Sequence, residues 1–542
     1  MPGMHKEAGL MIINKEFFHR SIKGLVIAVS ALCLGTIVSG VVSLAACCEI
    51  TNRWGEKRYY DTFSEGWCYA VHAASSDANT MTTIKLLTNW EASTSKQTIR
   101  CRGEKYTVGK YNLGSDLKRK HVEGLDNSKS EVDGFSGGHL NVKDGKRFTI
   151  DLNGFNIDRK RGNNQDDDGE LINVSGGAYL RIIDSNPNAR KTIDGVQTTG
   201  GCLMGGASED GAGGIHIKDG GYVHMTGGNI CANQTNEDGG GVYVNGGSSK
   251  LFLENVHVFR NKTRDAKSDT NGAGVYVNGG RVRIRNCIFR RNESEDYGGG
   301  IFSDEGNGYI VIEDSQFIGN RANDNSGGGI YIDRGNLKIK NCTFDGNYAR
   351  EKGGGIFVED DDGAVIRDCT FINNSADKHG GAFYADDDDI HFINCVIRNN
   401  KAGENGGGVY LDHDADINFQ GVMKVYDNRG SGNRKDDVYF DPESRVHSGG
   451  LLDGSNIGVR SRKSFKILEN ITQYEYDKFF KSNTGSLSKK IRSTTDETFL
   501  ASVFANKSIM IIAGIILLAI VSAIVGVVAE RKRKQKNTDT LN

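Results

Sequence analysis

Aspartate-rich segments recur through the middle of the chain and supply the oxygen ligands that calcium prefers in proteins. The acidic side chains concerned are Asp360, Asp361, Asp362, Asp386, Asp387, Asp388, Asp412, Asp414 and Asp416. The three runs occupy the same place in successive repeats, so stacked repeats would bring them together as one acidic ridge. Two interpretations stay open. The ridge binds calcium, because stacked like charges repel unless a cation lies between them, or it is a solvated edge that keeps the protein soluble.

Aromatic residues recur at the same interval, each in the middle of a triplet whose outer residues are apolar, apart from Ser303. They are Tyr243, Tyr276, Phe302, Tyr331, Phe357, Tyr384 and Tyr410. Side chains alternate between the two faces of a strand, so inward aliphatic neighbours place each ring outward. The resulting stripe would stack on sugar rings or bury a partner's apolar surface. Alternatively, the rings stack on one another and stabilise the sheet. The adjoining segments alternate Arg283 and Arg285, Glu313, then Lys338 and Lys340, and these mixed charges indicate a solvated face.

Two further sets of equivalent positions predict structural ladders. One set is Asn261, Asn292, Asn320, Asn347, Asn374, Asn400 and Asn428. Asparagine tolerates the left-handed backbone of a sharp turn, and its amides can hydrogen-bond from repeat to repeat. The other set is Cys287, Cys342, Cys369 and Cys395, with Ser315 in the repeat between the first two. Cysteine packs well as a small apolar residue, so we interpret this ladder as structural and not as a metal or redox site.

The elements that must position these residues are short strands in a repeated unit. The clearest copies are GGGIYIDRGNLKIKNCTFDGN from Gly327 and GGGIFVEDDDGAVIRDCTFINN from Gly353. Apolar residues alternate with period 2, which indicates strands with one buried face. One such unit cannot bury its apolar side alone, so the units must stack. With 72 glycines for tight turns and only 3 prolines, the chain predicts an all-β fold, a right-handed parallel β-helix or solenoid.

The glycine cluster with its aliphatic residues, followed by Phe-x-x-Asn, resembles the repeat of polymorphic outer membrane proteins and of other bacterial surface proteins with right-handed β-helices. The resemblance covers about residues 213–428. It implies a surface protein with a pectin lyase-like fold. The chain departs from that family at its C-terminus, where a single apolar segment takes the place of an autotransporter barrel, so a protein held by a C-terminal helix fits better.

Both ends of the chain carry membrane signals. A basic head and apolar segment over 1–48 predict a signal peptide that is cleaved, an uncleaved anchor, or a lipoprotein signal with lipidation at Cys47. Residues 508–529 are long enough for a transmembrane helix and precede a basic cytoplasmic tail over 530–542. Between them we predict an N-terminal cap with early coils over 49–140, the β-helix over 141–460, and a C-terminal cap and stalk over 461–507. We therefore expect a cell-membrane protein with its β-helix outside the cell. Of the cysteines before the coils, Cys68 and Cys101 are candidates for a disulfide.

The sequence favours binding over catalysis. Gly-His-Gly and Arg-Ile-Lys, which belong to the polygalacturonase signature, are absent, and Asn-Thr-Asp occurs only at 537–539 in the tail. The net charge of −2 does not suggest a nucleic-acid partner. We predict an adhesion protein that binds glycans or host-surface proteins without catalysis and requires no cofactor. A polysaccharide-active enzyme that uses calcium, or a passive structural component of the cell surface, are the alternatives.

Overall fold

The computed structural model describes residues 46–483, apart from 78–80, 102–103, 109, 114–137, 166–168, 210, 265–269, 305–307, 360–362, 387–388, 442–443 and 462–467. The predicted signal segment up to residue 45, the transmembrane helix over 508–529 and the basic tail lie outside the described residues. So do Asp360, Asp361, Asp362, Asp387 and Asp388 of the predicted acidic ridge.

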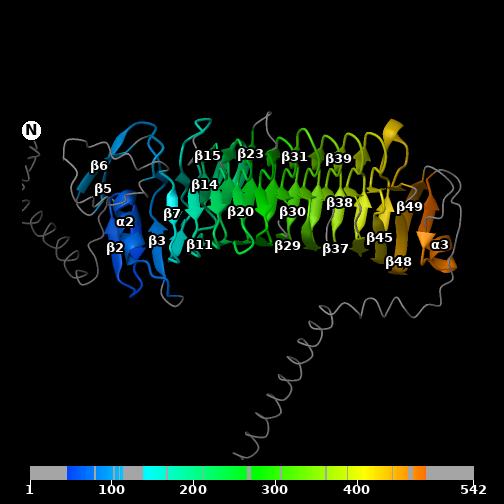
Figure 1. The fold of residues 1–542 in the computed structure, drawn as a ribbon, viewed down its shortest axis with the longest axis horizontal. Helices are drawn as coiled ribbons and strands as arrows, with labels where there is room; N and C mark the ends of the chain where they lie inside the picture. Colours follow the sequence, from blue (N-terminus) through cyan, green and yellow to red (C-terminus); the bar gives the residue numbers. More distant parts are fainter. Residues whose placement is uncertain are drawn as a thin grey trace, which may run out of the picture. The chain divides into compact units, whose positions relative to one another are not determined.

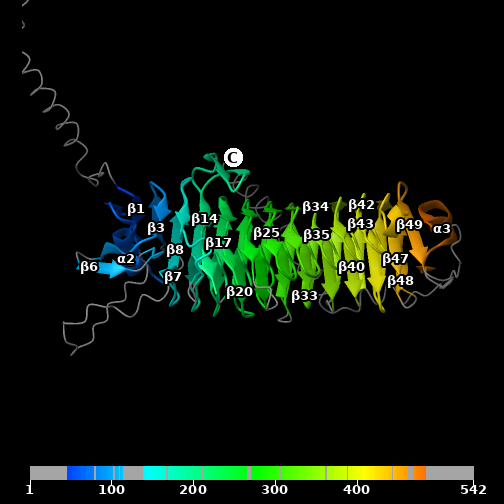
Figure 2. The same cartoon turned by 90° about the horizontal axis from the view of Figure 1, so that it is seen from above.

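The chain winds into a parallel β-solenoid of about 11 turns (Figure 1). A full turn contains four strands, which we number as faces 1 to 4 in chain order. A view at right angles shows the same strands stacked turn upon turn (Figure 2).

Face 1 carries the predicted aromatic residues. Its strands are β7 (Leu140–Val142), β10 (Ile172–Val174), β16 (Ile215–Ile217), β20 (Val242–Asn245), β24 (Val275–Asn278), β28 (Ile301–Ser303), β32 (Ile330–Ile332), β36 (Ile356–Glu359), β40 (Phe383–Asp386), β44 (Val409–Asp412) and β47 (Val438–Phe440).

Face 2 is the larger part of a 15-stranded sheet. Its parallel strands are β3 (Thr82–Leu86), β8 (Arg147–Asp151), β11 (Tyr179–Ile183), β17 (Tyr222–Thr226), β21 (Lys250–Glu254), β25 (Arg281–Arg285), β29 (Gly308–Glu313), β33 (Gly335–Lys340), β37 (Ala364–Arg367), β41 (Asp389–Ile393), β45 (Asp416–Gly421), β48 (Arg445–Leu451) and β50 (Leu468–Glu469).

Face 3 follows a sharp turn after face 2. Its strands are β4 (Trp90–Glu91), β9 (Ile157–Asp158), β14 (Cys202–Met204), β18 (Asn229–Cys231), β22 (His257–Phe259), β26 (Ile288–Arg290), β30 (Gln316–Ile318), β34 (Thr343–Asp345), β38 (Thr370–Ile372), β42 (Val396–Arg398), β46 (Lys424–Tyr426), β49 (Asn456–Ser461) and β51 (Phe480–Ser482). Strand β49 pairs with both β46 and β47 and so joins faces 1 and 3 in one sheet.

Face 4 consists of two-residue strands before each glycine cluster. They are β15 (Ala207–Ser208), β19 (Gln234–Thr235), β23 (Lys262–Thr263), β27 (Glu293–Ser294), β31 (Arg321–Ala322), β35 (Tyr348–Ala349), β39 (Ser375–Ala376) and β43 (Lys401–Ala402). Two hairpins lie outside the four faces, β5 (Gln97–Cys101) with β6 (Glu104–Val108) and β12 (Arg190–Ile193) with β13 (Val196–Thr199). A short 3-10 helix, η1, covers Ser431–Asn433.

The core lies inside the coils, and the register repeats it from turn to turn. Ile330 and Ile332 pair with Ile356 and Val358, and all four are buried. On face 3 the phenylalanine at each equivalent position stacks on the next, with ring centroids 4.8 Å apart for Phe317 and Phe344. The period-2 pattern thus places the same kind of side chain at the same height in each turn, as expected for stacked parallel strands.

Each end of the solenoid is covered by a helix. At the start, β1 (Cys48–Thr51) pairs antiparallel with β2 (Lys57–Tyr60) and with β3, and α2 (Phe63–Ala73) packs on them with Trp67 buried against Phe148. At the other end lies α3 (Gln473–Phe479), which Thr472 and Glu475 cap reciprocally. These caps protect core and backbone groups that an open solenoid end would expose.

Candidate functional site

The predicted aromatic residues form a column on face 1, but their rings are buried. Tyr331 is 6% exposed, Phe357 4% and Tyr384 0%. Neighbouring rings lie parallel, with centroids 4.6 Å apart for Tyr331 and Phe357. The expectation that the stripe faces solvent and contacts a ligand is therefore wrong for Tyr276, Phe302, Tyr331, Phe357, Tyr384 and Tyr410, while Tyr243 at the start of the column is half-buried.

The glycine clusters explain this burial. The first glycine of a cluster has a positive φ, 65° at Gly353, and turns the chain back over the ring four residues later. A Cβ on Gly353 would lie 2.7 Å from the Cβ of Phe357. The aromatic column is therefore a second packed layer outside the coil interior. Alternation correctly predicted the outward direction, but it gave no sign of the turn that covers the rings.

The tyrosines of the column direct their hydroxyls at an acidic row at the end of face 1. Tyr276 donates to Asp304 over 2.6 Å, Tyr331 donates to Glu359, and Tyr384 donates to Asp412. Burial, and then the hydrogen bond to Asp412, raises the pKa of Tyr384 well above its usual value, so its hydroxyl stays protonated. These three donors hold the carboxylates of alternate turns, in a row whose like charges would otherwise repel.

The predicted acidic ridge is only partly assembled. Asp386 and Asp412 are paired in register at the ends of β40 and β44. Asp414 is exposed in the following turn, and Asp416 begins β45 on face 2, where it pairs in register with Asp389 and contacts His447. A single ridge of all the predicted aspartates is therefore wrong, because the turn after Asp412 carries Asp416 to another face.

One group of described residues could hold a metal ion, namely Asp386, Asp412 and His413. His413 Nδ1 contacts Asp386 and lies 4.0 Å from Asp412 Oδ2. Burial opposes ionisation of Asp412, but hydrogen bonds from Tyr384 and Asp441 outweigh it and lower the pKa of this carboxyl. Phe357, one turn before Tyr384, has no hydroxyl to donate to Asp386, and His413 takes that place. His413 is exposed, and its contacts with the two carboxylates are those of an ion-pair network at the surface.

The asparagine ladder is a continuous hydrogen-bonded chain. Asn347 Nδ2 donates to Asn374 Oδ1 over 2.9 Å and to the Phe317 carbonyl over 2.9 Å, and the Asn347 backbone N–H donates to the same Asn374 oxygen. Every ladder residue from Asn261 to Asn428 is fully buried. Of the two reasons predicted for asparagine, the amide hydrogen bonds from repeat to repeat are confirmed. The left-handed backbone is wrong for the ladder residues, because positive φ falls on the preceding residue, such as Asn373 at 58°. Asparagine is needed as a donor and acceptor that replaces the strand pairing lost at the turn.

The cysteine ladder is likewise buried and unlinked. Cys287, Cys342, Cys369 and Cys395 are free thiols, each at most 2% exposed. The Cys342 backbone N–H points at Cys369 Sγ over 3.4 Å, and the Cys287 N–H donates to Ser315 Oγ over 3.0 Å. Burial raises the pKa of Cys287 to about 12, so this thiol is not poised for reaction.

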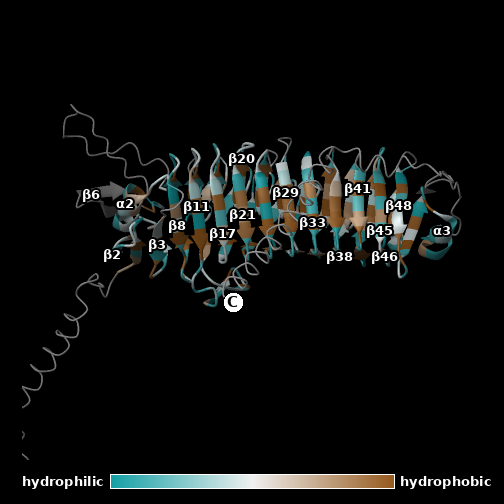
Figure 3. Cartoon of the chain, turned by 90° about the horizontal axis from the view of Figure 1, so that it is seen from below, coloured by the Kyte–Doolittle hydropathy of each residue, from teal (hydrophilic) through white to brown (hydrophobic). Residues whose placement is uncertain are grey.

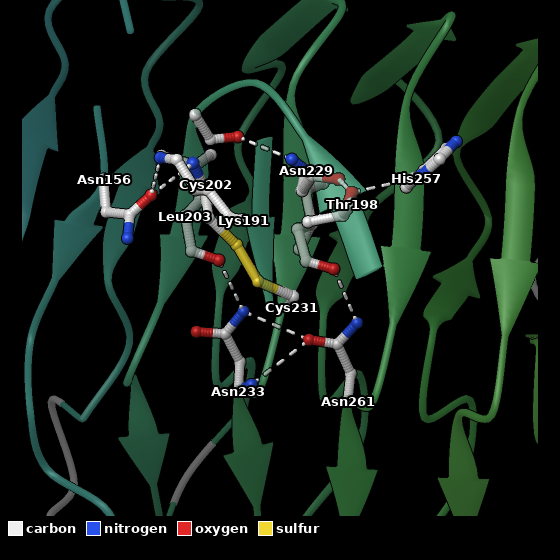
Figure 4. The surroundings of a disulfide bond; sticks show 12 residues. Asn156, Lys191, Thr198, Cys202, Leu203, Asn229, Cys231, Asn233, His257 and Asn261 are labelled. Carbon is white, nitrogen blue, oxygen red and sulfur yellow. Dashed lines mark hydrogen bonds between the residues drawn. A yellow bond between two sulfur atoms is a disulfide. The ribbon is translucent and has the colours of Figure 1, made fainter. Parts of the chain in front are cut away.

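A disulfide between Cys202 and Cys231 was not predicted. It joins β14 to β18 on face 3, as Figure 4 shows, and lies in a small apolar cluster with Phe259 and with Ile193 and Val196 of the β12–β13 hairpin. Thr198 of the hairpin donates to Asn229 over 2.6 Å. The signal in the sequence was two cysteines one repeat apart, outside the positions of the cysteine ladder. Cys68 is also disulfide-bonded, while the side chain of Cys101 is not described, so that pairing stays a prediction.

Hydrophilic and hydrophobic residues alternate along the strands of face 2 (Figure 3), and several of these strands carry half-buried or exposed aromatic side chains. Tyr179 and Tyr222 are half-buried, with ring centroids 4.9 Å apart. Next to them His224 stacks on Phe252 at 4.6 Å, and Tyr309 is 39% exposed. These residues come from β11, β17, β21 and β29, whose alternate side chains form the solenoid core.

Cationic side chains lie over several of these rings. The guanidinium carbon of Arg147 is 4.4 Å from the centroid of Tyr179, that of Arg283 is 5.7 Å from Phe252, and Lys338 Nζ is 5.3 Å from Tyr309. The sequence indicated a solvated face of mixed charge here but not its rings, because the rings fall at different positions in different strands and only the register brings them together. We call the outward side chains of β11 to β37 the aromatic–basic face.

Comparison with known proteins supports the fold. A family model described as a right handed beta helix region matches residues 172–333 and 273–436. The fold of the described residues is a right-handed parallel β-helix. Its four-strand coils and buried ladders run through this matched segment. No curated protein and no solved structure gives a significant match. The resemblance to the polymorphic outer membrane protein repeat therefore stays a prediction.

The predicted membrane attachments are not tested by the described residues. None of the helices between residues 46 and 483 has the length and apolar character to cross a bilayer. Cys47 is buried in the N-terminal cap, where its N–H donates to the Tyr60 carbonyl over 2.8 Å. Lipidation of this thiol would have to displace that packing.

Proposed function

We propose that this β-helix is a non-enzymatic binding protein of the cell surface that contacts glycans through the aromatic–basic face. The observation that carries the proposal is the set of accessible rings on one flat sheet, from Tyr179 and Tyr222 to Phe252 and Tyr309. Sugar rings stack on aromatic side chains that present an apolar face to water. A flat parallel sheet presents such rings at one height along several turns.

An extracellular location fits the cysteine chemistry. Cys202 and Cys231 form a disulfide, and Cys68 is also oxidised. Disulfides persist in oxidising compartments and are rare in the cytosol. We propose that the apolar segments over 1–48 and 508–529 deliver and anchor the solenoid there. A surface protein of the polymorphic outer membrane protein type, acting in adhesion, is the context that the sequence resemblance favours.

The alternative of a calcium-dependent polysaccharide-cleaving enzyme rests on the cluster at Asp386, Asp412 and His413. Asp412 accepts a hydrogen bond from Tyr384, and the nearby bases His413 and Lys352 are engaged with the Asp386 and Asp412 carboxylates. These contacts favour binding without catalysis. A passive structural role would leave the aromatic–basic face without a ligand.

The proposal is tested by glycan binding of the full-length protein. We expect retention of glycans without release of cleaved sugar, with or without calcium. The double variant Tyr222→Ala, Phe252→Ala should weaken binding at least about fivefold, because each lost stacking contact is worth roughly 0.5–1.5 kcal/mol. The control Tyr348→Ala removes a half-buried ring from face 4 and should leave binding unchanged. Release of cleaved sugar, or equal binding by both variants, would contradict the proposal.

A further inference from the structure

The outward side chains of the aromatic–basic face are mostly cationic, although the whole chain has a net charge of −2. The basic residues on β11 to β37 are Arg181, Lys250, Arg281, Arg283, Arg285, Lys338, Lys340 and Arg367. The acidic residues on the same strands are Glu254 and Glu313. The charge of the chain is therefore distributed unevenly, with the carboxylate row on face 1 and an excess of positive charge on face 2.

Few of these cations are neutralised locally. Arg285 pairs with Glu254, and Arg283 lies 3.1 Å from Glu313. Within the part of the chain that the structure describes, the other six basic residues of the face make no ion pair. Arg181, Arg281, Lys338, Lys340 and Arg367 are all exposed. Like charges held this close on a rigid sheet repel one another, so an anionic ligand would relieve a cost that the free protein carries.

The cations are arranged in rows along the axis of the solenoid. Arg283, Val311 and Lys338 are in register on β25, β29 and β33. Arg285, Glu313 and Lys340 form the next row, which Arg367 continues on β37. Neighbouring strands in a sheet are about 4.8 Å apart. Along the solenoid axis, a charged side chain of this face therefore lies one or two strands from the next ring or charge.

The patch has defined ends. On β41 and β45, directly after β37, the outward positions of face 2 are no longer occupied by Arg and Lys. On these two strands Asp389 is paired in register with Asp416, and His391 with Asn418. At the other end Arg147 covers the ring of Tyr179. The rings of β11 to β29 and the cations that continue to β37 thus lie on one uninterrupted stretch of the sheet, which ties the two features to one ligand.

We infer that the aromatic–basic face takes a polyanionic glycan, a chain of uronate or sulfated sugars lying along the solenoid axis. This inference rests on the proposed function and adds the charge class of the ligand. Carboxylate or sulfate groups on successive sugars would meet the Arg and Lys rows, and the sugar rings would stack on Phe252, Tyr222 and Tyr309. Arginine suits this contact, because its planar fork binds carboxylate and sulfate through paired hydrogen bonds.

A binding assay on the full-length protein separates charge from stacking. The probes are polygalacturonate, the same chain fully methyl-esterified, heparin, and polyadenylate RNA. We expect polygalacturonate or heparin to bind at least about tenfold more tightly than the neutral ester, with affinity that falls as salt rises, because exposed charges are screened. Comparison of polygalacturonate with heparin identifies carboxylate or sulfate as the preferred group, and either result supports the inference.

Matched variants locate the binding charge. Arg283→Gln with Lys338→Gln should raise the Kd for the preferred polyanion at least about tenfold and reduce its salt dependence. Arg321→Gln with Lys401→Gln makes the same charge change on face 4 and should alter the Kd less than about twofold. All four side chains are exposed, so both variants keep the fold.

The outcomes that overturn the inference differ from those that overturn the proposed function. Equal affinity for polygalacturonate and its ester, with loss on Tyr222→Ala, Phe252→Ala, would leave a glycan-binding face and overturn the polyanion. RNA that binds as tightly as the preferred glycan would overturn the assignment to glycans. Failure of every acidic and neutral glycan to bind would overturn the proposed function itself.

Discussion

At the scale of single residues, burial decides what each conspicuous side chain can do. The ring of Phe357 and the thiol of Cys369 recur at intervals that invite a functional interpretation, and both are buried by their neighbours. Tyr309 and Arg283 stand out less in the sequence, yet they are exposed on a rigid sheet. Accessible side chains are therefore the ones available to a ligand.

His216 gives a prediction at this scale. Its ring stacks on Tyr243 at the start of the aromatic column, with centroids 5.0 Å apart. Burial, with smaller effects from Lys218 and His139, lowers the pKa of His216 to about 3. The unfolded state therefore binds a proton on this histidine more readily than the folded state does. The free energy of unfolding decreases as the pH falls from about 6.5 towards 3.

We expect the free energy of unfolding to fall by about 2 kcal/mol more between pH 7 and pH 5 in the natural protein than in His216→Phe. Phenylalanine keeps the stacked ring and removes the titrating group. Denaturant unfolding at the two pH values measures the difference. The control His72→Asn changes an exposed histidine and should behave as the natural protein does. An identical pH response in His216→Phe would contradict the prediction.

At the scale of elements, the repeat made the strands of the solenoid predictable, but not which outward side chains remain exposed. Alternation at Ile330, Tyr331 and Ile332 directly gives a strand and its buried face. It cannot give the glycine turn that closes over Tyr331, because that contact depends on backbone conformation four residues away. The aromatic–basic face was missed for a related reason. Tyr222 and Tyr309 fall in one row, with Phe252 in the next, only through the register of the four strands β17, β21, β25 and β29.

The disulfide on face 3 gives a prediction at this scale. Cys202→Ser with Cys231→Ser should destabilise β14, β18 and the β12–β13 hairpin by roughly 2–4 kcal/mol, because it reopens the loop between the cysteines. Hydrogen exchange of these strands, compared with β33, measures the loss. Cys342→Ser with Cys369→Ser is the matched control, because Ser315 already occupies that ladder and donates to Glu313 O over 2.7 Å. Protection of β14 and β18 equal to that in the control would contradict the prediction.

At the scale of the whole molecule, the solenoid is a one-dimensional structure in which each turn contacts only its neighbours. Its stability is then a sum of local terms, and its ends are the weakest points. The last turns lack a following coil, and α3 takes that role. Glu475 is buried there and accepts hydrogen bonds from Ser448 Oγ over 2.7 Å and from the Leu451 N–H over 3.0 Å.

Glu475→Ala should therefore destabilise the C-terminal turns of the solenoid and leave the other turns unchanged. It leaves the buried Leu451 N–H without its acceptor, which costs roughly 1–3 kcal/mol, and it removes the acceptor of the Thr472 N–H at the exposed start of α3. We expect faster hydrogen exchange in β48 and β51, with β29 and β33 unchanged because no contact carries the effect past the adjacent turns. Asp477→Ala, on the exposed side of the same helix, is the control and should leave exchange unaltered. Loss of protection along the whole solenoid in Glu475→Ala would mean that the turns unfold together, and the description of the rod as a stack of locally stable coils would be wrong.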